Sequence, residues 1–319
     1  MTNKKAASLL LCNVIIINLF ISCVTNTAVL APAEPYPGME IYRYPQNRFV
    51  YSFPNDEYDT LIIVLEGGGW HSALGVMQDN FWKVTGITSM LLPELRGVYA
   101  FLVPEKLKRQ PGPDYYEDME DRANYTAENL VAGYTESINK FLADHDFSSI
   151  VLIGFSEGAL LLPFVYEKMD GKDKVTAMVS MGFGGLSMYE SYGILSSTRS
   201  FYPPDWIEFF ADVLATFNPE KSDYPDSYEE DYFGLTYRYH KSFMHIRPFD
   251  YYKNIDIPIL FIHGDDDDVI PWESTFYLQE NLPEKPFTYK YFPWEHYPEA
   301  EADILQFRKE IAQWVLTHS

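Results

Sequence analysis

The sequence predicts an α/β protein with a mostly parallel central sheet, helices on both faces and a mainly helical lid insertion. Short apolar runs rich in β-branched residues alternate with longer helical stretches after about residue 39. This alternation is typical of parallel strands connected by helices. A segment crowded with tyrosine, phenylalanine and acids interrupts it at residues 186–254. Of the 319 residues, 47% are hydrophobic, which is enough for one large core.

The strands are placed by apolar runs that end at turn residues. They are expected at Met39–Tyr44, Arg48–Phe53, Leu61–Leu65, Val98–Val103, Ile150–Ile153, Val175–Met181, Pro258–Ile262 and Phe287–Phe292. The first two alternate in polarity and predict an antiparallel pair. Leu61–Leu65 and Ile150–Ile153 are apolar on both faces and predict buried strands.

The helices are placed by apolar residues at helical spacing, as in Thr126–Asp144, where Leu130, Tyr134, Ile138 and Phe141 share one face. Further helices are expected between Asp79 and Leu92, from the turn after Ile153 to about Lys168, at Asp205–Phe217, within Tyr228–Phe243, at Ser274–Leu282 and at Ala302–Thr317. Leu107–Arg122 contains Pro111-Gly112-Pro113 and predicts a loop. The expected core therefore comprises residues 39–185 and 255–319, and the lid comprises residues 186–254.

A reactive serine is indicated at Ser156. It lies in Gly154-Phe155-Ser156-Glu157-Gly158, between an apolar strand and a helix-forming stretch. A G-x-S-x-G sequence in this setting predicts a tight, strained turn that exposes the hydroxyl, called a nucleophile elbow. Glycines are needed on both sides because side chains there would collide with the strand or the helix. The N–H of Glu157 would face a developing oxyanion.

The partners that such a serine needs occur downstream, in the order acid and then histidine. The first is the run Asp265–Asp268, which follows a predicted strand, and the second is His296, which follows the last one. A serine hydroxyl is a weak nucleophile, so an imidazole must take its proton, and a buried carboxylate must orient that imidazole.

Together these motifs resemble those of the α/β-hydrolase family, with its order Ser, acid, His. The segment from His263 to Pro271 is similar to the family's acid turn, and this alignment implies Asp267 as the acid. The resemblance covers nearly all of the chain after about residue 39, and it implies an esterase or related acyl hydrolase that uses no metal or cofactor.

Alternatives to these assignments remain open. The acid could be Asp265, Asp266 or Asp268 if the register is shifted, and the four aspartates could form a solvated turn or a calcium-binding loop. His296 could be a packed histidine. His263, which more plausibly shapes the acid turn, is its first competitor, followed by His71, His240 and His245.

An oxyanion-binding loop is predicted at Glu66-Gly67-Gly68-Gly69-Trp70-His71. Glycines let N–H groups approach a substrate carbonyl closely. The loop resembles the His-Gly-Gly-Gly-Trp motif of the family, which implies a hole made by the N–H groups of Glu157 and of Gly67 or Gly68. Glu66 departs from that motif, and we expect its carboxylate to bond the loop backbone. A glycine turn without a ligand is the alternative.

The N-terminus predicts export. Lys4 and Lys5 precede an apolar stretch that ends at Ser22, which is typical of a signal peptide. Leu19–Cys23 resembles a bacterial lipoprotein box, in which lipid is attached to Cys23; an ordinary cleaved signal and a retained anchor are the alternatives. Residues 23–38 would form a tether, and the chain would be a membrane-anchored lipoprotein of a bacterial cell envelope.

The charge of the chain excludes one class of partner. Its formal net charge is −22, and such a surface repels the phosphates of nucleic acids. The expected partners are a small ester or acyl substrate and the membrane that holds the Cys23 lipid. The aromatic residues of the lid predict a pocket for an apolar or aromatic group, unless they only pack the lid itself.

The predicted function is therefore hydrolysis of a carboxylic ester, or of a related acyl bond, through Ser156, His296 and Asp267. A serine peptidase of the proline-iminopeptidase type and a surface-tethered binding protein with an unused triad are the alternatives. A metal-dependent hydrolase is the weakest option.

Overall fold

The computed structural model of this chain describes residues 38–44, 48–54, 59–69, 72–78, 81–84, 86–96, 98–106, 119–198 and 204–319. The predicted signal peptide, Cys23 and nearly all of the tether lie outside these residues, as do Trp70, His71 and most of the predicted loop after Leu107. Within the described part of the chain, no helix is both long and apolar enough to cross a membrane.

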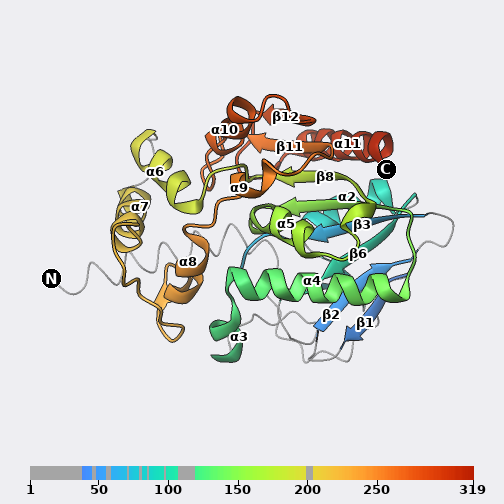
Figure 1. Cartoon of the computed structure of the whole chain (residues 1–319), viewed down its shortest axis with the longest axis horizontal. Coiled ribbons are helices and arrows are strands. Elements are labelled where there is room, and N and C mark those ends of the chain that lie inside the picture. The colour runs from blue at the N-terminus through green and yellow to red at the C-terminus, as the bar shows by residue number, and fades with distance from the viewer. Residues whose placement is uncertain are drawn as a thin grey trace.

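An eight-stranded sheet forms the centre of the fold (Figure 1). In spatial order its strands are β1 (Glu40–Tyr44), β2 (Arg48–Phe53), β6 (Ala100–Pro104), β3 (Thr60–Leu65), β7 (Ser149–Phe155), β8 (Val175–Met181), β11 (Ile259–Gly264) and β12 (Phe287–Phe292). Only the pairings that involve β2 are antiparallel, and all others from β6 to β12 are parallel. The predicted mostly parallel sheet is confirmed, and its strands start and end close to the expected residues.

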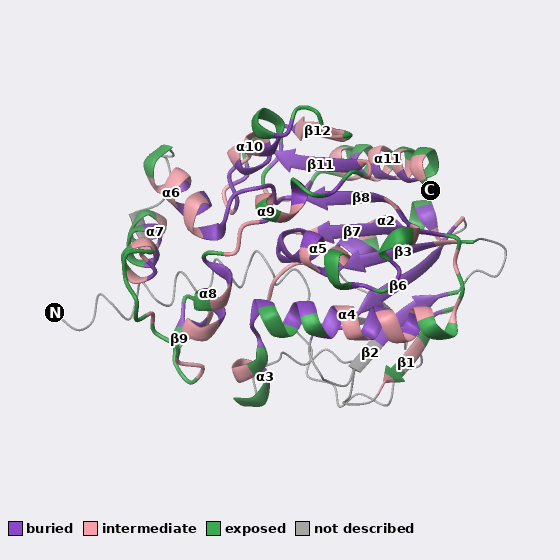
Figure 2. Cartoon of the chain, in the orientation of Figure 1, coloured by how far each residue is buried: buried purple, intermediate pink, exposed green. Residues whose placement is uncertain are grey.

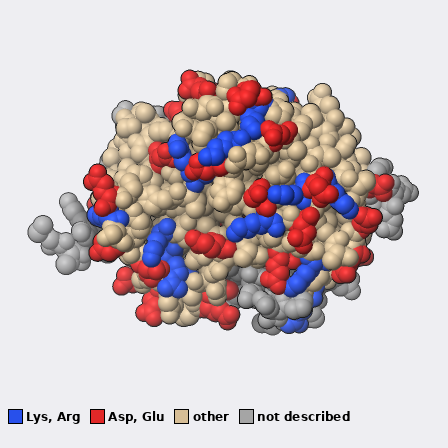
Figure 3. All heavy atoms as spheres, in the orientation of Figure 1, with Lys and Arg blue, Asp and Glu red and all other residues tan. Residues whose placement is uncertain are grey.

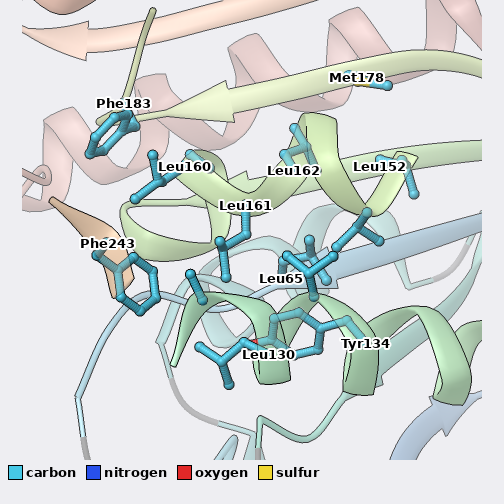
Figure 4. Packing of buried hydrophobic residues seen from close by; sticks show 14 of the residues in the cluster. Leu65, Leu130, Tyr134, Leu152, Leu160, Leu161, Leu162, Met178, Phe183 and Phe243 are labelled. Atoms are coloured by element: carbon cyan, nitrogen blue, oxygen red, sulfur yellow. The ribbon is translucent and has the colours of Figure 1, made fainter. Parts of the chain in front are cut away.

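Helices cover both faces of this sheet, as the alternating pattern predicts. On one face α4 (Ala127–Asp144) packs on α5 (Glu157–Lys168), and on the other α2 (Gly86–Leu95) packs on α11 (Glu301–His318). In strand β3, successive side chains contribute to the hydrophobic clusters on opposite faces of the sheet. Leu61, Ile63 and Leu65 join the hydrophobic cluster under α4 and α5, whereas Ile62 and Val64 join the one under α2 and α11. Figure 2 shows this burial running through the central strands, and Figure 4 shows part of the first cluster.

The segment between β8 and β11, which we call the cap, is mainly helical, as expected. It contains α6 (Met188–Thr198), α7 (Pro204–Thr216), the short strands β9 (Asp231–Tyr232) and β10 (Leu235–Thr236), α8 (Tyr237–Phe243) and α9 (Phe249–Tyr252). In Figure 1 the arrowheads of β8 and β11 point toward the side on which α6, α7 and α8 lie. The cap therefore stands beyond the carboxyl ends of the parallel strands, where open α/β sheets bind their ligands.

Two local predictions differ from the structure. A helix was expected from Asp79 on, but β4 (Leu74–Gln78) and β5 (Phe81–Val84) form an antiparallel hairpin there. The helix α2 begins only at Gly86, which has a φ of 60°. Phe81-Trp82-Lys83-Val84 is rich in residues that favour strands, which outweighs the helical spacing. The predicted loop up to Arg122 also ends early, because α3 occupies Met119–Asn124.

Helix α10 (Glu273–Asn281) lies between β11 and β12, within one residue of the predicted bounds. The N-terminus of α4 is capped by Thr126, whose hydroxyl accepts a hydrogen bond from the N–H of Asn129 at 3.3 Å. All four residues of the predicted apolar face of this helix are buried. The fold thus carries the ends of β3, β7, β8 and β11 to one edge of the sheet, beneath the cap.

Candidate active site

Ser156 occupies a sharp turn between β7 and α5. Its backbone angles are φ 52° and ψ −115°, and a positive φ is strained for a residue with a side chain. The turn is held in place by its own backbone, because the N–H of Ser156 donates to the carbonyl of Met181 at the end of β8, at 2.8 Å. Strain of this kind is common at functional sites, where the surrounding structure maintains it.

Neither of the two glycines on either side of Ser156, Gly154 and Gly158, could be replaced by a residue with a side chain without a clash. A Cβ on Gly158 would lie 2.1 Å from the carbonyl oxygen of Leu65, and a Cβ on Gly154 would lie 2.6 Å from the carbonyl oxygen of Gly158. These contacts are with backbone atoms, which cannot rotate away. The turn therefore packs α5 directly against the end of β3.

The acid turn after β11 buries one of its four aspartates. Asp267 is 0% exposed, whereas Asp265 and Asp266 are exposed. Its Oδ1 accepts the N–H groups of Val269 and Ile270, both at 2.9 Å, and its Oδ2 accepts Nδ1–H of His296 at 2.8 Å. Burial works to raise the pKa of Asp267, but the charges and hydrogen bonds of His296 and His263 outweigh it and hold that pKa well below its usual range.

His296 faces Asp267 with one ring nitrogen and leaves the other unpartnered. Its Nε2 is buried and makes no hydrogen bond, with Ser156 or with any other described residue. Burial works to lower the pKa of His296, but the Asp267 carboxylate raises it by more, so the pKa lies above its ordinary value. The ring packs on Phe155 at 5.2 Å between centroids, and a Cβ on Gly182 would lie 3.0 Å from its Cε1.

Ser156 and His296 thus both lie beside the end of β8. Ser156 bonds Met181, the last residue of β8, and His296 lies against the next residue, Gly182. Phe155, which precedes Ser156, contacts the imidazole. Hydrogen bonds between nucleophile and base are often long in unliganded enzymes and tighten with substrate, and proton transfer between Ser156 and His296 stays a prediction.

Two of the competing histidines, His263 and His240, have other partners. His263 is buried beside the acid turn: its Nε2 lies 3.0 Å from the carbonyl of Ile270 and 3.2 Å from Asp267, and its Nδ1 lies 2.8 Å from Thr275 Oγ1. A carbonyl only accepts, so Nε2 carries the proton, and His263 shapes the turn. His240 is buried in the cap, where burial lowers its pKa to about 4, and its Nε2 bonds the carbonyl of Tyr232. His71 lies outside the described residues.

The metal alternative has no site in the part of the chain that is described. Within those residues no group of three or more His, Cys, Asp or Glu side chains is arranged to hold a metal ion. In the acid turn, for which a calcium-binding loop is the alternative, both oxygens of Asp267 accept N–H groups. This arrangement therefore suits a carboxylate that orients the imidazole of His296.

The glycine loop after β3 lies directly against the elbow. A Cβ on Gly67 would stand 3.5 Å from Cβ of Ser156, and a Cβ on Gly68 would stand 3.4 Å from Oε2 of Glu157. Glu157 is the first residue of α5, so its N–H has no acceptor within the helix. The glycine loop therefore lies next to Ser156 and Glu157. The binding of an oxyanion by the N–H groups of Glu157 and of Gly67 or Gly68 stays a prediction.

We expected Glu66 to bond its own loop, but its hydrogen bonds with the described residues go to α2. Its carboxylate accepts the N–H groups of Ile87 and Thr88, at 3.0 and 2.9 Å, in the first turn of α2. Burial raises the pKa of Glu66, and these hydrogen bonds offset part of the rise. The physical reason is that a helix N-terminus offers several unpaired donors and a favourable dipole, which one loop N–H cannot match. The Glu66 carboxylate is consequently bound to the N-terminus of α2.

Three buried polar residues near the elbow were not predicted: Lys106, Tyr125 and Tyr239. The hydroxyls of Tyr125 and Tyr239 lie 3.0 and 2.9 Å from Oε2 of Glu157, and Lys106 Nζ donates to the carbonyl of Gly69 at 3.2 Å. Tyr125 stood in the sequence as part of an Asn-Tyr-Thr run, and Tyr239 as one of many cap aromatics. No spacing rule connects them to Glu157.

Charges of both signs are mixed over the surface. Figure 3 shows Lys and Arg interspersed with Asp and Glu on the face that it presents, without a continuous basic area. Several of these groups pair, for example Arg238 and Lys241 with Asp226 at 2.8 Å each.

One protein family and several solved structures are similar to this chain. The profile of a family described as "Serine hydrolase (FSH1)" matches residues 131–304, which is more than half of the chain. The match begins in α4 and includes the elbow, the cap, the acid turn and His296. No curated protein matches the sequence significantly.

Several solved structures share the fold. The esterase Est1E of Butyrivibrio proteoclasticus, solved with bound ferulic acid, is 15% identical with a TM-score of 0.56, over 85% of this chain and 96% of that one. An esterase of Pyrococcus furiosus is 14% identical with a TM-score of 0.56, over 92% and 97%. An acylaminoacyl peptidase of Pyrococcus horikoshii is 14% identical with a TM-score of 0.55; it is matched over 96% of this chain, which spans only 42% of the peptidase. At these identities the likeness concerns the fold, which is that of the α/β-hydrolases.

Proposed function

This chain belongs to the FSH1 serine hydrolase family, and on that premise we propose that it cleaves carboxylic esters or related acyl bonds with Ser156, His296 and Asp267. One observation carries the proposal. The Asp267 carboxylate holds Nδ1 of His296 at 2.8 Å, while the buried Nε2 of that ring has no hydrogen-bond partner among the described residues. A buried imidazole that is oriented on one side and open on the other is suited to accept a proton.

The reaction would follow from this geometry. Nε2 of His296 takes the hydroxyl proton of Ser156 as Oγ attacks the substrate carbonyl, and the Asp267 carboxylate stabilises the resulting imidazolium. The N–H groups of Glu157 and of Gly67 or Gly68 would bind the tetrahedral oxyanion. His296 then gives the proton to the leaving alcohol, and water hydrolyses the acyl-enzyme by the same steps in reverse. These steps need no metal or cofactor.

A small ester with an apolar or aromatic part is the substrate class that we favour. The cap carries many aromatic side chains, and some pack on one another, as in the contact between Tyr192 and Phe210 at 5.3 Å. Such surfaces suit apolar or aromatic substrate groups. The esterase Est1E, which shares the fold, binds ferulic acid, an aromatic acid. The proposal extends this chemical class, and no individual compound, to the present chain.

A covalent probe tests the proposed nucleophile. We expect a fluorophosphonate to label residues 38–319, produced without the predicted signal and tether, and we expect Ser156→Ala to remove both the labelling and the hydrolysis of p-nitrophenyl esters. Loss of the nucleophile of a triad typically costs about 10⁶ in turnover. Ser148→Ala, at an exposed serine before β7, is the matched control and should label normally. Equal labelling of the Ser156→Ala protein would refute the assignment.

Parallel assays with aminoacyl anilides separate an esterase from a peptidase of the proline-iminopeptidase type. We expect turnover of the esters to exceed that of the anilides. Preference for the anilides would assign the peptidase, and tight binding of esters without turnover would assign a binding protein.

We also propose that the chain is exported and anchored by a lipid on Cys23, a residue outside the described part of the structure. The support is the charged and apolar leader of the sequence. In a bacterial host, the full-length chain should incorporate an alkyne-labelled fatty acid and sediment with membranes, because an acyl chain adds apolar area that enters the bilayer. Cys23→Ala should abolish incorporation, and Cys12→Ala is the control. Incorporation that persists in Cys23→Ala would contradict the anchor.

A further inference from the structure

The side chain of Glu157 has a role that the proposed reaction does not explain. Its backbone N–H belongs to the predicted oxyanion hole, but its carboxylate is buried, with the residue 6% exposed. An acid in the first turn of a helix can stabilise the helix dipole from an exposed position as well. Burial of a carboxylate is costly unless donors surround it, so the donors that surround this one are informative.

The first donor connects Glu157 to the glycine loop. The Tyr125 hydroxyl lies 3.0 and 3.1 Å from the two oxygens of Glu157, and it accepts the N–H of Gly69 at 2.8 Å. A hydroxyl has a single proton, which the carboxylate attracts more strongly than the nearby carbonyl of Gly69 does. Lys106 Nζ donates to that carbonyl at 3.2 Å. Both backbone groups of Gly69 are therefore held, two residues after Gly67.

The second donor connects Glu157 to the cap. The Tyr239 hydroxyl, on α8, donates to Oε2 of Glu157 at 2.9 Å. Tyr239 is 4% exposed, and its ring packs on those of Tyr125 and Phe243, with centroids 5.0 and 4.4 Å away. Figure 4 shows Phe243 beside Leu130 of α4 and the leucines of α5. Helix α8 is therefore joined to the core by packing as well as by the hydrogen bond.

Buried charges of opposite sign meet at this point. Lys106 is 1% exposed, and burial lowers its pKa, while the carboxylates of Glu157, Glu105 and Glu66 work to raise it. Burial likewise raises the pKa of Glu157, and Lys106 and the two hydroxyls work to lower it. An unbalanced carboxylate beside an oxyanion hole would repel the oxyanion. Lys106 supplies the balancing charge on the side of the glycine loop.

We propose that Glu157, Tyr125 and Tyr239 form a positioning device, in which one buried carboxylate holds the glycine loop and the cap helix α8 in fixed relation to Ser156. This inference rests on the proposed function, because the groups that it positions are the N–H donors of the oxyanion hole. The cap then takes part in transition-state binding through Tyr239, in addition to shaping the pocket. Positioning errors well below a bond length weaken such donors.

The test removes single hydroxyls and leaves the rings in place. In Tyr239→Phe and Tyr125→Phe we expect kcat for a p-nitrophenyl ester to fall about tenfold, less than the ~10²–10³ lost with a whole oxyanion donor. KM should stay within about twofold, because these residues act on the transition state. The boronic acid phenylboronate forms a tetrahedral adduct with the serine, so its inhibition constant should rise by the same factor as kcat falls.

Tyr232→Phe is the matched control. Tyr232 is also a buried cap tyrosine, and its hydroxyl donates to a carboxylate, Asp212, at 2.8 Å. That bond stays within the cap and does not reach the elbow. Its loss should leave kcat, KM and the inhibition constant near those of the unmodified protein, although it removes a hydrogen bond of the same kind.

Glu157→Gln is the third variant and keeps the volume of the side chain. It should lower kcat, and its effect should not add to that of Tyr125→Phe in a double-mutant cycle, because the two residues share one hydrogen bond. Unchanged kcat in all three variants, a rise in KM alone, or an equal loss in Tyr232→Phe would overturn the proposal. Labelling of Ser156 in the unmodified protein tests the proposed function separately, so the two failures can be distinguished.

Discussion

Replacing Asp267 by asparagine is expected to lower kcat about 10⁴-fold, as the loss of a triad carboxylate does elsewhere. Oδ1 of the new side chain can still accept the N–H groups of Val269 and Ile270, so the turn should survive. Its amide nitrogen would face Nδ1 of His296, and two donors cannot bond. The imidazole would then carry its proton on Nε2, where it cannot take the proton of Ser156.

The pH profile of the same variant gives a second readout. Asp267 raises the pKa of His296, and the imidazole must be neutral to act as a base. Activity of the unmodified protein should therefore fall as the pH drops through this pKa. Without the charge at position 267 the pKa of His296 is lower, so the acid limb of the remaining kcat/KM should move to lower pH.

Asp266→Asn is the control for both readouts. It removes the same charge from the same turn, but Asp266 is exposed. Its kcat and its acid limb should stay near those of the unmodified protein. A loss in Asp266→Asn as large as that in Asp267→Asn would mean that the acid was assigned in the wrong register.

Replacing Gly158 by alanine should destabilise the whole fold. The added Cβ would lie 2.1 Å from the carbonyl oxygen of Leu65 and 2.7 Å from that of Glu66. Relief requires α5 to move away from β3, which opens the larger of the two cores. We expect the free energy of unfolding to fall by about 3 kcal/mol, at the upper end of overpacking effects. The melting temperature should fall by roughly 6–12 °C.

Gly193→Ala provides the comparison. Gly193 lies within α6, and a Cβ there would have no atom within 4 Å. Alanine favours the helix, so this variant should be as stable as the parent or more stable by about 0.5–1 kcal/mol. Equal melting temperatures for Gly158→Ala and the parent protein would show that the elbow does not pack as described.

The sequence predicts the scaffold of this protein well because local signals agree with the tertiary structure. The alternating apolar residues of β3 supply both cores, and Thr126 caps α4 where the chain enters a helix. The order of Ser156, Asp267 and His296 also suffices to place these residues at one edge of a parallel sheet. What brings them there is the common direction of the strands.

The remainder depends on contacts that no spacing rule encodes. The destination of the Glu66 carboxylate is set by α2, a helix some twenty residues later, whose free N–H groups compete with those of the nearby loop. The hydrogen bonds of Tyr125 and Tyr239 to Glu157 join segments far apart in the chain. Whether the cap acts as a lid is likewise a question of motion, and it stays a prediction.

The pairing of β8 with β11 has a consequence for how such enzymes diversify. The chain leaves the sheet at the end of β8 and returns at β11, and these strands are direct neighbours, with the N–H of Gly182 bonded to the carbonyl of Ile262. A foreign segment of almost any length could be spliced between these points without separating the strands. Such a segment would nevertheless need a hydroxyl donor in place of that of Tyr239. Without it Glu157 would lose a partner, and the protein with the exchanged segment would fold without supporting full turnover.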